Sequence, residues 1–143
     1  MIGRLKGLLG LERRADPPFD PETFVYISLP GNIQPMARGA QYEDRIESEL
    51  ACRGLGGVSG GGSLLSEPRP DGSRVVESCG IDVDVVDLAA ALAVLHDLLP
   101  QLGAPHGSEL HYTRQGVRLL DRLSGTGWQQ GQARTTLHPG FGV

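Results

Sequence analysis

Residues 74–86 read R-V-V-E-S-C-G-I-D-V-D-V-V, and this stretch decides the fold of the chain. In its second half polarity alternates: Ile81 and Val83 share one side of an extended backbone, while Asp82 and Asp84 share the other. Successive side chains of a strand point to opposite faces of a sheet. The pattern therefore predicts a strand with one buried face and one solvated face.

A helix is expected directly after this strand. Asp87 precedes the run L-A-A-A-L-A-V-L-H-D-L-L, and its carboxylate can accept hydrogen bonds from the exposed amides of a first helical turn. The predicted helix spans residues 88–99, because Pro100 lacks a backbone donor and should end or kink it. An earlier helix is predicted over residues 41–53, where apolar residues recur at i, i+4 and i+8.

The remaining strands follow from β-branched and aromatic runs bounded by turn residues. They are expected at residues 24–29, 56–66 and 109–113, and residues 117–123 add either a strand or a short helix. The order strand, helix, strand, strand, helix, strand predicts an α+β, two-layer sandwich of ferredoxin-like β-α-β-β-α-β order. An antiparallel sheet would carry both helices on one face and leave the other face open.

The length of 143 residues predicts one domain, residues 22–123. Residues 1–21 are expected to be a short basic segment followed by a Pro-rich linker. Residues 124–143, rich in Gly and Gln, are expected to be a C-terminal tail. Trp128 and Phe141 would hold this tail on the open face of the sheet.

Charge and composition narrow the function classes. The formal net charge is −4, which disfavours nucleic acid as a partner and suits a basic protein. The two cysteines, Cys52 and Cys79, are isolated and fit the reducing conditions of the cytoplasm. No run of apolar residues is long enough for a transmembrane helix. We therefore expect a soluble, cytoplasmic protein, with no expectation about its oligomeric state.

The best polar constellation lies on the solvated face of the 74–86 strand. Asp82 and Asp84 could supply oxygen ligands to a divalent cation, and His111 could join them as a metal ligand. Asp82, Asp84 and Glu109 could instead form an acidic patch that binds a protein partner. A third interpretation is a solvated strand face that resists aggregation.

The glycine-rich run at residues 54–63 does not predict a cofactor site. A Walker loop needs a lysine, and no lysine follows Lys6. In a dinucleotide-binding fingerprint starting at Gly54, Ser59 stands where the third glycine belongs. The run follows a predicted helix and enters a strand, which is the reverse of the required order. We expect no cofactor, and we interpret the run as a flexible or bulged strand that another backbone, or a partner, approaches closely.

Several stretches carry a family resemblance: F-V-Y-I-S-L-P-G, Y-E-D-R-I-E-S-E-L, the glycine run, C-G-I-D-V-D-V-V-D and L-G-A-P-H-G-S-E-L-H-Y. With them the chain resembles small uncharacterised bacterial α+β proteins, similar in outline to the immunity-type proteins of toxin systems. The resemblance covers residues 24–123, assigns no catalytic residue and implies a cytosolic binding protein.

Three functions follow as hypotheses. The first is a non-catalytic protein-binding module with an acidic sheet face, immunity-like in outline. The second is a small metal-dependent enzyme or metal-binding domain that uses Asp82, Asp84, Glu109 and His111. The third is a ligand-sensing domain that dimerises edge to edge. Unrelated functions share this topology, so the topology alone does not choose among them.

Overall fold

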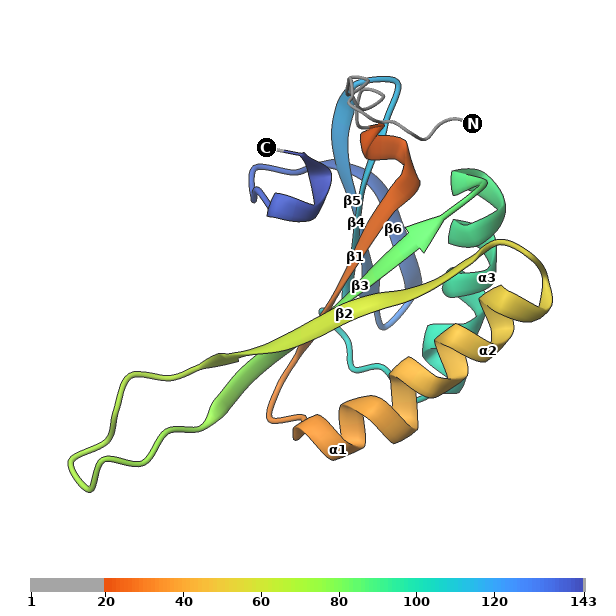
Figure 1. Cartoon of the computed structure of the whole chain (residues 1–143). Coiled ribbons are helices and arrows are strands. Elements are labelled where there is room, and N and C mark those ends of the chain that lie inside the picture. Colours follow the sequence, from red (N-terminus) through yellow and green to blue (C-terminus); the bar gives the residue numbers. More distant parts are fainter. Residues whose placement is uncertain (1–19, 143) are drawn as a thin grey trace, which may run out of the picture.

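The computed structural model describes residues 20–142 and shows one six-stranded antiparallel sheet with helices on one face (Figure 1). The order across the sheet is β2-β3-β1-β4-β5-β6. The α+β class, the antiparallel sheet and its two main helices are confirmed. The basic segment predicted near the N-terminus lies outside the described residues. The strands are β1 (Phe24–Pro30), β2 (Gly56–Leu65), β3 (Val76–Val85), β4 (Glu109–Arg114), β5 (Val117–Ser124) and β6 (Gly127–Ala133).

Two helices cover the sheet, α2 (Asp44–Cys52) and α3 (Leu88–Gln101). The helical run that ends with α2 starts earlier than the predicted residue 41, because a short α1 (Pro35–Ala37) and a π-helical segment, η2 (Arg38–Glu43), precede α2 without a break. The helical run begins at a proline, whose fixed φ suits a first turn and whose missing N–H would have no partner there. Residues 20–142 also contain two 3-10 turns, η1 (Pro21–Thr23) and η3 (Pro139–Phe141).

The pairing of β1 with β3 sets the two faces of the sheet. Ile27 lies opposite Ile81, and both are fully buried under the helices. One residue away, Tyr26 lies opposite Asp82 on the face that the helices leave open. The predicted division of the 74–86 strand into a dry and a polar face is confirmed. The helix-covered core further contains Val25, Leu29, Tyr42, Ile46, Leu50, Val83, Ala91, Leu95, Leu99, Leu110 and Tyr112.

The hairpin of β2 and β3 extends well past the body of the domain as an arm (Figure 1). β2 forms one edge of the sheet, and β6 forms the other. The arm ends in a turn at Asp71 and Gly72, where Ser73 donates two hydrogen bonds to the Asp71 carboxylate. The predicted antiparallel hairpin and its turn are therefore present.

The end of the chain differs from the expected tail. Residues 127–133 form β6, which pairs with β5 from Leu119 to Ser124. Phe141 is buried on the open face against Phe24, with ring centroids 4.9 Å apart. Trp128 lies on the opposite, helix-covered side and packs against the core. The segment from residue 124 onward thus adds a strand to the sheet and packs against both of its faces.

Trp128 also explains how α3 continues through Pro100. In an α-helix the amide of residue 100 would donate to the carbonyl of His96, but proline has no amide hydrogen. The indole Nε1 of Trp128 donates to that carbonyl instead, at 2.9 Å. The helix therefore ends at Gln101, beyond the predicted stop, and β6 is fastened to it.

We predict that Trp128→Phe lowers the unfolding free energy by about 1–2 kcal/mol, because the His96 carbonyl loses its donor. The loss should be smaller in a Pro100→Ala background, where the restored amide can donate to the same carbonyl. Urea unfolding of the four proteins measures this coupling as a double-mutant cycle. Strictly additive losses would contradict the assignment of Trp128 as the replacement donor.

Candidate functional site

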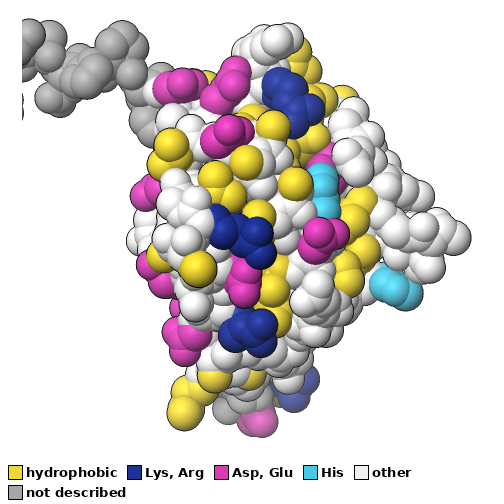
Figure 2. All heavy atoms as spheres, turned by 90° about the vertical axis from the view of Figure 1, so that its right-hand side faces the viewer, with side chains coloured by type: hydrophobic (Ala, Val, Ile, Leu, Met, Phe, Trp, Pro, Cys, Tyr) yellow, Lys and Arg dark blue, Asp and Glu magenta, His cyan; other side chains and the backbone are white. Residues whose placement is uncertain are grey.

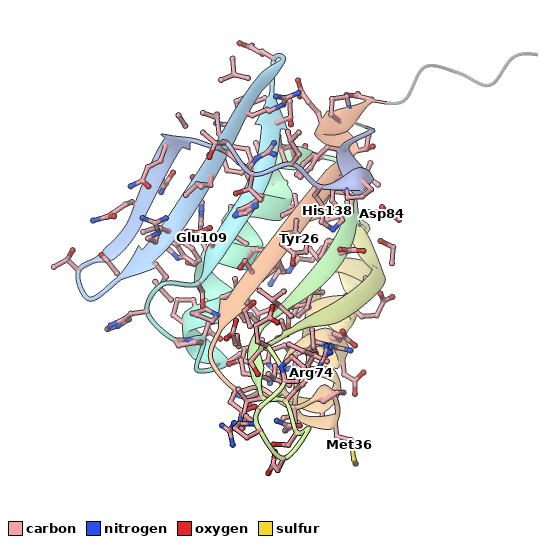
Figure 3. The ribbon with its side chains drawn as sticks, turned by 90° about the vertical axis from the view of Figure 1, so that its left-hand side faces the viewer. Tyr26, Met36, Arg74, Asp84, Glu109 and His138 are labelled. Atoms are coloured by element: carbon pink, nitrogen blue, oxygen red, sulfur yellow. The ribbon has the colours of Figure 1, made fainter. Side chains whose placement is uncertain are left out.

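The open face of the sheet carries a row of polar side chains across its central strands (Figure 3). Tyr26 on β1 lies opposite Asp82 on β3 and opposite His111 on β4. The register also places Asp84 and Glu109 on this face. Asp84 is exposed, Asp82 and Glu109 are half-buried, and His111 is buried. Asp82, Asp84, Glu109 and His111 therefore share this face with Tyr26, which the sequence analysis did not single out.

The Tyr26 ring can lie over Gly80 of β3 because glycine has no side chain. A Cβ on Gly80 would collide with the Tyr26 ring and hydroxyl. Because Gly80 has no side chain, the Tyr26 ring leans across β3, and the Gly80 backbone beside the ring is not covered by a side chain of its own. Burial and the nearby Asp82 raise the pKa of the Tyr26 hydroxyl, so it stays a neutral hydrogen-bond donor.

The C-terminal segment crosses the upper half of this face (Figure 3). The His138 ring lies 4.5 Å from the ring of Tyr26, centroid to centroid, and its Nε2 lies 3.4 Å from Asp82 Oδ1. Nδ1 of His138 accepts the Gly140 amide, so a neutral ring carries its proton on Nε2, facing the carboxylate. The segment is anchored by buried Arg134, which donates to the carbonyls of Tyr112, Leu119 and Thr136.

A groove of about 330 Å³ remains on the lower half of the face. Its walls are Tyr26, Asp82 and His138 on one side and Leu64 on the other, with Gly80 in its floor. Gly61, Gly62, Ser63, Ser78 and Cys79 complete the lining. The side chain of Cys79 itself belongs to the helix-covered core, opposite Leu29. Burial there raises the pKa of the thiol, which is therefore protonated and a poor nucleophile.

Glu109 is engaged by its neighbours. It accepts a hydrogen bond from His111 Nε2 at 2.8 Å and from Arg122 Nε at 2.8 Å. Burial acts to raise the pKa of Glu109, but these two donors outweigh it and the net pKa is lowered. Burial lowers the pKa of His111, only partly offset by the hydrogen bond to Glu109. Of the three carboxylates predicted to bind a partner, Glu109 is thus the least available.

The residues of the metal hypothesis are not assembled. Because strands lie about 4.8 Å apart, His111 is two strand spacings from Asp82, with Tyr26 between them. His111 bonds to Glu109, and Asp82 faces His138. Within residues 20–142, no three His, Cys, Asp or Glu side chains are grouped to hold a metal ion.

The glycine-rich run forms most of β2, and side chains of η2 and α2 explain two of its glycines. A Cβ on Gly57 would lie 2.7 Å from Glu47 Oε1, and a Cβ on Gly61 would overlap the Glu43 carboxylate. Glu47 also accepts the backbone N–H of Val58 at 2.7 Å. The expected close approach of another backbone occurs at Gly56, where a Cβ would collide with the Asp84 carbonyl, whereas at Gly57 and Gly61 the close atoms belong to acidic side chains.

A second polar cluster, which the sequence did not suggest, lies on the helix-covered side. Asp121 is only 1% exposed. Its Oδ2 is 2.6 Å from His96 Nε2, and its Oδ1 accepts the Tyr112 hydroxyl at 2.6 Å and the Gly131 amide at 2.9 Å. Burial acts to raise the pKa of Asp121, but its three donors outweigh burial and lower it. Burial and the Asp121 carboxylate raise the pKa of Tyr112.

This cluster is structural in character. It joins α3, β4, β5 and β6, and every oxygen of the carboxylate has a donor. No serine or cysteine lies among its hydrogen-bond partners.

The helix-covered surface also mixes positive, negative and apolar side chains (Figure 2). A groove of about 380 Å³ between α2 and α3 contains the Glu49–Arg53 ion pair.

Comparison with known proteins adds no assignment: no family model, no curated protein and no solved structure matches the chain. Within residues 20–142, no helix has the length and apolar character needed to cross a membrane. The candidate site is therefore chosen from its geometry alone, and of the surfaces described the open-face groove is the most suitable binding site.

Asp121 should make the stability of the fold depend on pH in the acid range. Because its folded pKa lies below the ordinary value of about 3.9, it stabilises the fold above that value, and this contribution is lost as the pH falls through the folded pKa. We predict that Asp121→Asn lowers the unfolding free energy by about 2 kcal/mol at pH 7 and that the deficit shrinks below pH 4. Urea midpoints at pH 7, 4 and 3 measure this.

The matched control is Asp97→Asn, which removes an exposed carboxylate from the same side of the molecule. It should leave both the stability and its pH profile nearly unchanged. An Asp121→Asn deficit that stays constant from pH 7 to pH 3 would contradict the role given to this carboxylate.

Proposed function

We propose that this chain is a non-catalytic, cytoplasmic protein-binding module, immunity-like in outline, that takes a basic partner on the open face of its sheet. The observation that carries the proposal is the groove beside Tyr26. It includes Gly80 in its lining and lies on the open face beside the C-terminal segment, whose His138 forms part of its wall. A groove whose lining includes the aromatic ring of Tyr26, the carboxylate of Asp82 and the imidazole of His138 suits an inserted basic side chain.

Charge favours a basic partner. Asp84 is exposed, and Asp82 lines the groove. The chain has 17 acidic and 13 basic residues, so its long-range field also attracts positive charge. His138 faces Asp82 but bears a full charge only when protonated. The two aspartates are therefore the groups that a basic side chain would meet first.

Catalysis is disfavoured by how the titratable groups are used. The Cys79 thiol is protonated and buried in the helix-covered core, Glu109 is paired with His111 and Arg122, and Asp121 is enclosed by its donors. A nucleophile needs an adjacent base that is not already occupied.

We propose a ferredoxin-like unit for residues 24–114, supported by the order β2-β3-β1-β4 and by the helices after β1 and β3.

We predict that linear peptides selected from a random display library on the immobilised full chain will be rich in Arg and Lys. Asp82→Asn combined with Asp84→Asn should weaken the best peptide about fivefold to tenfold, because two charges are lost from the binding face. The loss should shrink at high salt. Isothermal titration measures the affinities.

The matched control is Asp44→Asn combined with Asp97→Asn, which removes the same charge from exposed positions on the two helices. This variant should bind within about twofold of the original chain. Equal losses in the two variants, or peptides without basic residues, would overturn the proposal.

A further inference from the structure

The outer edge of β2 is open beside the groove. No strand within residues 20–142 pairs with it. The edge is closed near its start, where Glu47 accepts the Val58 amide, and register shifts fall between Val58 and Gly60 and between Leu64 and Leu65. The stretch Gly60–Leu64 remains as a regular edge.

This stretch lacks the features that usually protect an edge strand. It contains no charged residue and no proline, whereas proteins commonly place lysine, proline or a covering segment at such a position. Leu64 is 61% exposed, a high value for a leucine on a sheet. The other edge strand, β6, is shorter and has a register shift opposite the middle of β5.

The open edge and the groove adjoin each other. Gly60, Gly62 and Leu64 pair with Asp82, Gly80 and Ser78, so they lie on the open face. A Cβ on Gly60 would be 3.1 Å from Asp82 Oδ2, so this carboxylate leans over the glycine toward the edge. A Cβ on Gly62 would meet nothing within 4 Å, so the way from the edge to the groove is clear.

We propose that the partner binds as an extended basic segment that adds a seventh strand to the edge of β2 along Gly60–Leu64. This inference rests on the proposed function and specifies its binding mode. The backbone of the segment would pair with β2, as in other cases of strand addition. Every second side chain of the segment would lie on the open face, and the one level with Gly62 would reach into the groove as an arginine or lysine that meets Asp82 beside Tyr26.

A second copy of this chain is a poorer occupant of the edge. On the helix-covered side, Arg38 donates to Ser63, and Glu43 lies against Gly61. Two copies paired through β2 would bring these helical segments onto each other across the two-fold axis. A single extended segment has no such layer, and its alternate side chains would face the Arg38–Glu43 ion pair.

The test uses the tightest peptide from the display selection and scans it with N-methyl groups, which remove one backbone donor at a time. Strand addition predicts that methylation at alternate positions weakens binding at least about tenfold, while the positions between change it little. Hydrogen exchange of the full chain should show protection at Gly60–Leu64 when the peptide is present.

The matched variants are Gly62→Val, which fills the way into the groove, and Gly125→Val. A Cβ on Gly125 makes an ordinary 3.6 Å contact with His106, far from β2. Gly62→Val should lower the affinity for the peptide about tenfold, while the urea midpoint of this variant stays unchanged. Gly125→Val should not lower the affinity.

The outcomes separate the two proposals. A peptide that depends on Asp82 and Asp84 but shows no two-residue periodicity would overturn strand addition and leave the binding module standing. So would protection confined to β6, or self-association of the chain through β2. Failure to recover any peptide that depends on these aspartates would overturn both.

Discussion

The antiparallel pairing of β1 with β3 is the constraint on which the rest of the structure depends. With Ile27 opposite Ile81, the helices receive a continuous apolar surface, and Tyr26 and Asp82 are placed together on the other side. A slip of one residue would exchange the two faces, putting a carboxylate under α3 and isoleucine in water. Burial of these side chains therefore fixes the register, and the register in turn positions the groove.

The two faces use polar groups in opposite ways. Under the helices, Asp121 is enclosed, and its hydrogen bonds hold α3 to the last three strands. On the open face, Asp84 is exposed and Asp82 leans over Gly60 at the edge. The first arrangement stabilises the fold because a buried carboxylate must be fully bonded. The second leaves charge available to a partner.

The sequence predicted the first four strands and both helices because each has a clear local signal. The Asp87 cap is an example, since its carboxylate accepts the Ala90 amide at 3.1 Å as expected. The prediction for β5 was ambiguous because its polar and apolar residues do not follow the usual division into an apolar core side and a polar open side. Asp121 occupies a buried position between two leucines, while Leu120 lies among arginines on the open face. β6 has a single large apolar residue, so it had no alternation to detect.

The shared face of Asp82, Asp84, Glu109 and His111 was also predictable, since strand period and order determine it. The contacts that decide their chemistry were not. The separation of Asp82 from His111 by Tyr26, the return of His138 over the sheet and the glycine floor all depend on packing between distant segments. For the same reason, the link between Trp128 and the His96 carbonyl has no signature in the local sequence.

The central claim is that one face of the sheet is dry and the other accessible, and carboxyl labelling tests it directly. The folded protein is treated with a carbodiimide and an amine, and the rate of modification of each carboxylate is followed by mass spectrometry. The account predicts that Asp84 reacts about as fast as exposed Asp97, while Asp121 stays unmodified until the protein unfolds. Protection of Asp84, or modification of Asp121 in the folded protein at the rate of Asp84, would contradict it.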